Sequence, residues 1–151
     1  MKVEKIIFLD FDGVIITPRT KFLKFDPICI ELLQDLINRS DAFIVVSSSW
    51  RIGNTFRAMR AMFDGFDLFD KVIGMTPVQN GEWVRGQEID EWLKEPKLAS
   101  SQLELDLQGF VILDDDSDME PHMDRLVLCE WDGGLTKELV EKAIKVLDIP
   151  V

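Results

Sequence analysis

A short segment near the start of the chain, residues 6–14, constrains the fold more than any other feature. Four apolar residues (6–9) lead directly into Asp10, and Asp12 and Gly13 follow. A run that is apolar throughout is typical of a strand buried on both faces of a parallel sheet. Side chains two residues apart in an extended chain point the same way, so Asp10 and Asp12 can share one metal ion or one phosphate. The segment therefore predicts an acidic site at the end of a buried strand.

Further apolar runs alternate with helical patterns along the rest of the chain. Asp26 and Pro27 are typical of a helix start, Asn54 can cap a second helix, residues 86–95 predict a third, and Thr136 can cap the last. Alternating strands and helices predict a doubly wound (Rossmann-like) α/β fold with helices on both faces of a parallel sheet. The predicted strands are residues 3–9, 43–46, 71–75, 110–113 and 126–129.

Two segments have less distinct patterns. Residues 14–18 are apolar and end in proline, which predicts a small hairpin or flap beside the acidic pair. Residues 97–108 fit a partial helix no better than a loop. Neither the segment 13–41 nor the segment 51–84 has room for a sizeable cap domain. We therefore expect a single domain over residues 1–151 with an open site.

Length and charge limit the function classes. No apolar run approaches the roughly 20 residues that cross a bilayer, and Cys29 and Cys129 lack metal-ligand spacing, so we expect buried thiols and a cytoplasmic protein. The net charge of -11 argues against extended binding to nucleic acids or membrane surfaces. Residues 19–60 nevertheless hold seven basic and four acidic residues. This excess fits either solvated helix faces or a positive rim for an anionic substrate.

Polar clusters follow three of the predicted strands. They are Asp10 with Asp12, the serines at 47–49, and the aspartates at 114–116. In open α/β sheets, ligands bind beyond the carboxyl ends of the strands, near a switch in strand order. Crowded carboxylates repel one another unless a cation joins them, and ligation by oxygen alone suits Mg²⁺. The sequence therefore predicts a magnesium site at this edge of the sheet.

The same three clusters resemble motifs of the haloacid dehalogenase (HAD) superfamily, in its phosphatase branch. Residues 9–14 (LDFDGV) resemble the first motif, residues 45–47 (VVS) the second, and residues 112–115 (ILDD) the fourth. The stretch 48–51 (SSWR) and the helix beginning RGQEI at 85 are similar to small capless HAD domains of nucleic-acid repair proteins.

The resemblance implies a role for each acidic and hydroxyl group. Asp10 would attack phosphorus and form an aspartyl-phosphate, and Asp12 would protonate the leaving oxygen and later deprotonate the hydrolytic water. Ser47, with Ser48 and the backbone N–H groups that follow, would bind the phosphoryl oxygens. The implied Mg²⁺ ligands are Asp10, Asp12 through its carbonyl, Asp114 and Asp115, the last either directly or beside the metal.

The third motif of the family is a cation that steadies the nucleophile and the phosphate. Arg85 is our choice because it directly precedes the helix that leads to the fourth motif, and Lys94 and Lys97 are the alternatives. Arg51 follows the serines closely enough either to bind phosphate or to pair with nearby acids. Trp50 and Trp83 are expected to pack rather than to stack on bases.

These expectations combine into a magnesium-dependent phosphomonoesterase. Its substrate would be a small phosphorylated molecule or the phosphate end of a nucleic acid or protein, and capless relatives favour a nucleic-acid or nucleotide terminal phosphate. The alternatives are a weakly active or inactive HAD-like phosphate-binding module, a phosphoacceptor switch, and a magnesium-dependent nuclease. A switch would place its acceptor aspartate where this chain has Ser47, and a nuclease would need a catalytic glutamate later in its strand than Glu4.

Overall fold

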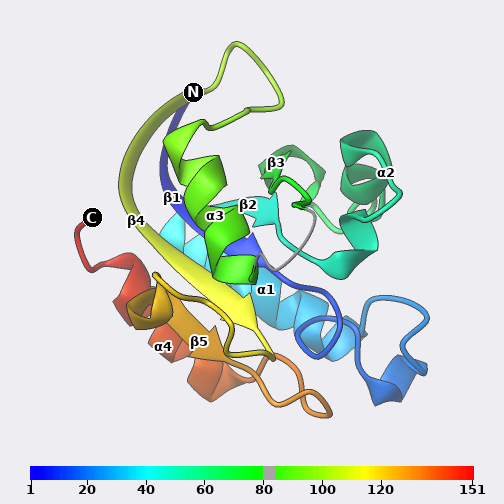
Figure 1. Ribbon diagram of the computed structural model, residues 1–151. Helices are drawn as coiled ribbons and strands as arrows, with labels where there is room; N and C mark the ends of the chain where they lie inside the picture. The colour runs from blue at the N-terminus through cyan, green and yellow to red at the C-terminus, as the bar shows by residue number, and fades with distance from the viewer. Residues whose placement is uncertain (80–83) are drawn as a thin grey trace.

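The computed structural model of the protein describes residues 1–79 and 84–151 and contains one parallel sheet of five strands. The strand order is β3-β2-β1-β4-β5, so the chain runs outward from β1 in one direction and then returns to fill the other side (Figure 1). The predicted doubly wound α/β fold is confirmed. The strands are β1 (Lys2–Leu9), β2 (Phe43–Val46), β3 (Val72–Met75), β4 (Glu104–Asp114) and β5 (Leu126–Leu128).

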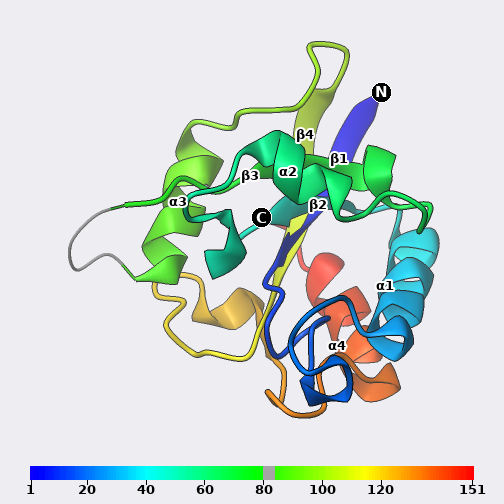
Figure 2. The ribbon, with the colours of Figure 1, turned by 90° about the vertical axis from the view of Figure 1, so that its right-hand side faces the viewer.

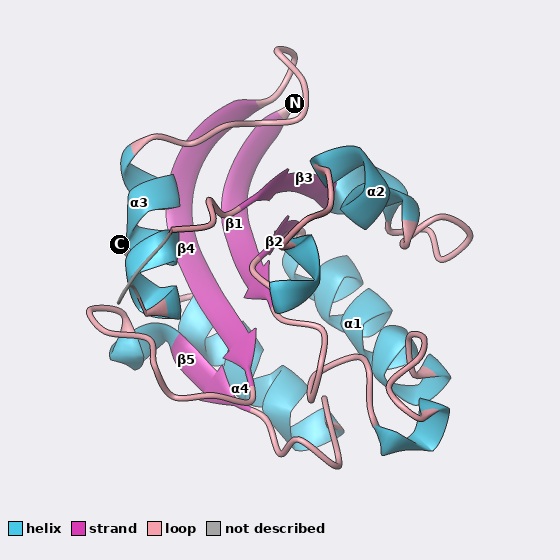
Figure 3. Cartoon of the chain, turned by 45° about the vertical axis from the view of Figure 1, so that its right-hand side comes forward, coloured by secondary structure: helices cyan, strands magenta, loops and turns pink. Residues whose placement is uncertain are grey.

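Helices cover both faces of this sheet (Figures 2 and 3). On β1, Ile7 and Leu9 face a core shared with α1 and α4, whereas Ile6 and Phe8 face a second core shared with α3. This alternation explains why residues 6–9 of the strand are all apolar. The helices are α1 (Pro27–Ser40), α2 (Phe56–Ala61), α3 (Arg85–Lys94) and α4 (Lys137–Leu147), with short 3-10 helices η1 (Pro18–Thr20), η2 (Ser49–Arg51), η3 (Phe69–Lys71) and η4 (Met123–Arg125).

Most of the predicted helix starts are confirmed. The Asp26 carboxylate accepts a hydrogen bond from the Ile28 amide at 3.0 Å, and the Thr136 hydroxyl accepts one from Leu139 at 3.2 Å. Helix α2 is capped by Thr55 rather than by Asn54.

Two segments differ from the expectations in their backbone. Residues 104–107 belong to β4 and not to a partial helix, because they pair with the first residues of β1, Lys2 opposite Glu104 and Val3 opposite Leu105. The apolar residues 14–16 form a fully buried turn rather than a flap, and the Phe11 carbonyl accepts from all three of their amides. This turn anchors the end of β1 in the core, so the acidic residues there are held on a fixed backbone.

The remaining expectations concern cysteines and membranes. Cys29 and Cys129 are buried free thiols, as expected. Among the helices of the described residues, none combines the length and the apolar content that a bilayer crossing requires.

Candidate active site

The register of the sheet brings the predicted clusters together. Leu9, the last residue of β1, pairs with Val46 of β2 on one side and with Leu113 of β4 on the other. The ladders continue one step further, since the Asp10 amide donates to the Leu113 carbonyl at 3.0 Å and the Ser47 amide donates to the Leu9 carbonyl at 2.9 Å. Asp10 thus lies between the ends of the two neighbouring strands, at the switch in strand order where ligands bind in such folds.

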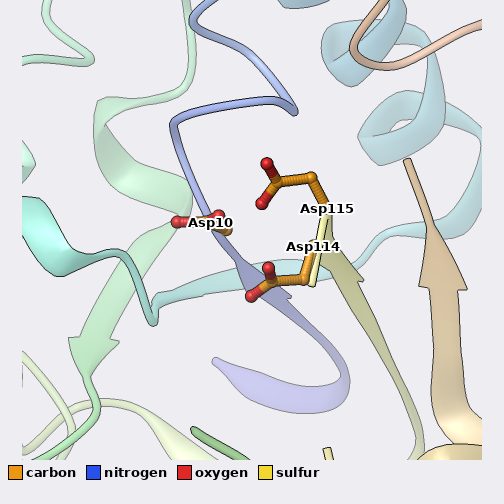
Figure 4. Close-up of side chains that lie close together, drawn as sticks. All are labelled: Asp10, Asp114 and Asp115. Atoms are coloured by element: carbon orange, nitrogen blue, oxygen red, sulfur yellow. The ribbon is translucent and has the colours of Figure 1, made fainter. Parts of the chain in front are cut away.

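Three carboxylates converge at this edge (Figure 4). Asp10, Asp114 and Asp115 each offer one oxygen, and these oxygens lie within 4.8 Å of one another. Gly13 makes room for Asp115: its φ is +80°, and a Cβ there would collide with the Asp115 carboxylate. The donor set is made of hard oxygen ligands at a spacing that one ion can bridge, so these residues fit Mg²⁺. The Asp12 side chain is not part of this group of three.

Burial makes this group electrostatically costly. Removal from water and the nearby Asp114 carboxylate raise the pKa of Asp10 to about 8, although the Arg85 guanidinium opposes the shift. Burial likewise raises the pKa of Asp114 to about 6, again against the effect of Arg85. Shifts of this kind occur where like charges are forced together, and a cation bound between the carboxylates would relieve them.

Arg85 supplies a positive charge to the cluster from the first turn of α3. Its Nη1 lies 3.1 Å from Asp10 Oδ1 and 3.0 Å from Asp114 Oδ2. The helix can start here because Gly86 packs so closely on the backbone at Met119 that any side chain at position 86 would collide with it. The alternative cations do not reach this cluster. Lys94 pairs with Asp90, and Lys97 is exposed beyond the end of α3.

The two serines differ in what their hydroxyls do. Ser47 is fully buried, and its Oγ has no hydrogen-bond partner among residues 1–79 and 84–151. Most buried hydroxyls have a hydrogen-bond partner, so an unpartnered one at this edge of the sheet can serve a bound anion. The Ser48 hydroxyl is already used, because it accepts from the Trp50 amide at 3.1 Å and caps η2. Ser47 therefore fits an anion site better than the Ser48 side chain does.

Comparison with known families agrees with this geometry. A family model described as the HAD domain in Swiss Army Knife RNA repair proteins matches residues 6–140. The chain belongs to this family. Searches of curated proteins and of solved structures found no significant match. The matched range contains every residue predicted for the site, and the family match confirms the resemblance to the HAD superfamily.

One predicted phosphate ligand of this HAD domain is placed differently. Arg51 is 2% exposed, and its five N–H donors are all engaged. Four of the five bonds go to backbone carbonyls, and the fifth goes to the Glu88 carboxylate. The carbonyls are those of Thr76, Ser47, Ser48 and Pro77. Because no donor is left for a substrate, we assign Arg51 to holding the loop after β2 instead of binding phosphate.

The expected positive rim is also largely neutralised. Four of the seven basic residues between 19 and 60 are in ion pairs with acidic partners. These residues are Arg19, Arg39, Arg51 and Arg60. The charge excess in the sequence therefore does not produce a free cationic surface of the same size in the HAD domain.

Sequence reasoning missed one contact at the site. Trp50, expected only to pack, donates from its indole Nε1 to Asp12 Oδ1 at 3.1 Å. No sequence pattern signals such a bond, because it depends on how η2 turns back over the end of β1. Trp83, for which packing was also expected, lies outside the described residues.

The raised pKa of Asp10 predicts how stability depends on pH. The folded HAD domain without metal keeps a proton on Asp10 that the unfolded chain has already lost, so this stabilisation is present below about pH 4 and is lost toward about pH 8. Asp10→Asn removes this effect. Relative to the variant, the free energy of unfolding of the wild type should therefore fall as the pH rises.

Urea unfolding in EDTA at several pH values, followed by tryptophan fluorescence, measures this difference. Added Mg²⁺ should close the gap at high pH, because it binds only the folded wild-type cluster tightly. Parallel pH curves for the two proteins would show that Asp10 is not perturbed by its neighbours.

Proposed function

We propose that this HAD domain is a magnesium-dependent phosphomonoesterase that works through an aspartyl-phosphate on Asp10. The observation that supports this most strongly is the position of Asp10, whose carboxylate lies between the Arg85 guanidinium and two further acidic groups at the switch in strand order. A simple anion-binding module would gain nothing from three crowded carboxylates, since they repel phosphate.

Mg²⁺ would be held by Asp10, Asp114, Asp115 and the carbonyl of Asp12, and it would neutralise charge on the phosphoryl group. The residues of the chain carry the remaining work. Arg85 holds the Asp10 carboxylate in place and offers positive charge toward the phosphoryl oxygens. The unpartnered hydroxyl of Ser47 and the amides that follow it supply neutral donors.

Two displacements then complete the reaction. An Asp10 oxygen attacks phosphorus, the bond from phosphorus to the ester oxygen breaks, and the leaving oxygen takes a proton from the Asp12 carboxyl. Water next attacks the phosphorus of the aspartyl-phosphate and gives its proton to Asp12, and the bond from phosphorus to Asp10 breaks. Both carboxyl groups return to their starting states, so one phosphate is released in each cycle.

For the substrate, we propose a terminal phosphate of RNA. The description of the matching family, which names RNA repair proteins, supports this choice. The buried turn at residues 14–16 supports it as well, because the segment after β1 packs into the core instead of forming a cover over the cluster. A net charge of -11 favours contact with a strand end over contact along a duplex.

A panel of phosphate esters tests the substrate class. Phosphate release should be magnesium-dependent, and kcat/KM should be highest for oligoribonucleotides carrying a 3′ or 5′ terminal phosphate. The comparison set is mononucleotides, sugar phosphates and a phosphopeptide, each assayed with wild type and Asp10→Asn. A higher kcat/KM for a sugar phosphate or the phosphopeptide would contradict the RNA assignment while leaving the phosphatase chemistry standing.

A further inference from the structure

The contact between Trp50 and Asp12 joins two separate segments at the site edge. The indole Nε1 donates to Asp12 Oδ1 at 3.1 Å, and both residues are half-buried. An indole N–H can only donate, so its partner must be an acceptor. Of the two Asp12 oxygens, one is therefore fixed against the indole.

The chain holds Trp50 firmly in this position. Its amide donates to the Ser48 hydroxyl at 3.1 Å, and its carbonyl accepts from the Asn54 side chain at 2.7 Å. The indole packs against the Phe11 ring, with centroids 6.2 Å apart. Arg51, the next residue, donates to the Ser47 and Ser48 carbonyls of the same loop. These contacts fix the backbone of Trp50 and hold its indole beside Phe11.

We propose that Trp50 is a positioning residue that orients the carboxyl group of the general acid Asp12. This orientation would allow the site to hydrolyse esters with poor leaving groups, such as ribose hydroxyls. This inference rests on the phosphatase function proposed above. The terminal torsion of an aspartate is broad, so an unheld carboxyl samples many orientations. With Oδ1 held by the indole, Oδ2 is the oxygen that carries the proton to the leaving group.

The identity of the leaving group makes this role measurable. When Asp10 displaces an alkyl ester, the electron pair of the breaking bond goes to an alkoxide oxygen, which needs the Asp12 proton as it departs. When the ester is 4-nitrophenyl phosphate, the departing phenolate is stable without that proton. If Trp50 no longer orients Asp12, hydrolysis of the alkyl ester should therefore slow much more than hydrolysis of 4-nitrophenyl phosphate.

Trp50→Phe provides the test, because it keeps an aromatic ring at the position beside Phe11 and removes the N–H donor together with the second ring of the indole. General acid catalysis contributes about 10²–10⁴-fold, so we expect kcat/KM for a ribonucleoside monophosphate to fall by about 10–100-fold. For 4-nitrophenyl phosphate it should stay within about threefold of wild type. The ratio kcat/KM covers only the steps up to the aspartyl-phosphate, so hydrolysis of that intermediate does not mask the effect.

Two further variants make the result interpretable. Asp12→Asn should show the same preference for the aryl ester, in stronger form. Trp131→Phe alters an exposed tryptophan in the loop after β5 and should leave both substrates unchanged. Equal losses on the two substrates in Trp50→Phe, or no loss, would overturn the positioning role. A wild-type protein that releases phosphate with Mg²⁺ neither from these two esters nor from an oligoribonucleotide with a terminal phosphate would instead overturn the proposed function itself.

Discussion

Replacing Asp10 with asparagine should lower kcat by on the order of 10⁴-fold or more, as expected when the nucleophile of a covalent mechanism is removed. The amide keeps the shape of the side chain, but it is a poor nucleophile and a weaker metal ligand. Release of phosphate from 4-nitrophenyl phosphate in Mg²⁺ measures the loss. Because the substituted group is buried and destabilised by its charge, the variant should remain folded and should be at least as stable as the wild type at pH 8 without metal.

A matched control separates this loss from a general effect of charge. Asp132 is an exposed aspartate in the loop after β5, at the same edge of the sheet, and Asp132→Asn should keep nearly full activity. Activity that survives in Asp10→Asn, or that is independent of added metal, would contradict the mechanism.

Replacing Arg51 with methionine should destabilise the fold by about 3–5 kcal/mol, the usual effect of removing one partner of a buried ion pair. The substitution leaves the Glu88 carboxylate buried without its guanidinium and removes the donors to four backbone carbonyls. For a chain of this size the melting temperature should fall by roughly 10 °C, at about 2–4 °C for each kcal/mol. Urea unfolding in EDTA measures the change without interference from bound metal.

The control for this variant is Arg39→Met. Arg39 also pairs with two carboxylates, but its side chain is 43% exposed, and exposed pairs contribute about 0–1 kcal/mol. The contrast between the variants isolates the effect of burial. If Arg51→Met were as stable as wild type but bound phosphate esters poorly, with a raised KM, Arg51 would be a substrate ligand, the other of the two roles that the sequence left open.

The convergence of Asp10, Ser47 and Asp114 could be predicted from the sequence. Parallel strands that start in register end at the same edge, so residues directly after buried strands meet there without any knowledge of side-chain packing. Arg85 was identified in a different way, from the resemblance to the HAD family, in which the third-motif cation precedes the helix that leads to the fourth motif.

The structure differs from the expectations where the burial of a segment does not follow from the polarity of its residues. For Arg51 the sequence left phosphate binding and pairing with an acid both open, and the structure shows it buried, paired with Glu88 and bonded to carbonyls of the loop. Residues 104–107 alternate between exposed and half-buried, a strand pattern that is too short to recognise without its partner β1. The apolar residues 14–16 turn inward because the Phe11 carbonyl closes them into a tight turn.

The contact between Trp50 and Asp12 was not predicted at all. It depends on the path of a 3-10 helix and on one side-chain rotamer, and neither has a periodic signature in the sequence. Side-chain contacts between loops are in general the part of a site that sequence patterns predict least well, although they can decide which substrates react.

Capture of a phosphoaspartate mimic tests the nucleophile most directly. Beryllofluoride added with Mg²⁺ should bind covalently to an Asp10 carboxylate oxygen, and a crystal structure of this complex would place the metal among Asp10, Asp114 and Asp115. Asp10→Asn should not bind beryllofluoride under the same conditions. Beryllofluoride bonded to any other aspartate, such as Asp12 or Asp114, would contradict the assignment of Asp10 as the nucleophile.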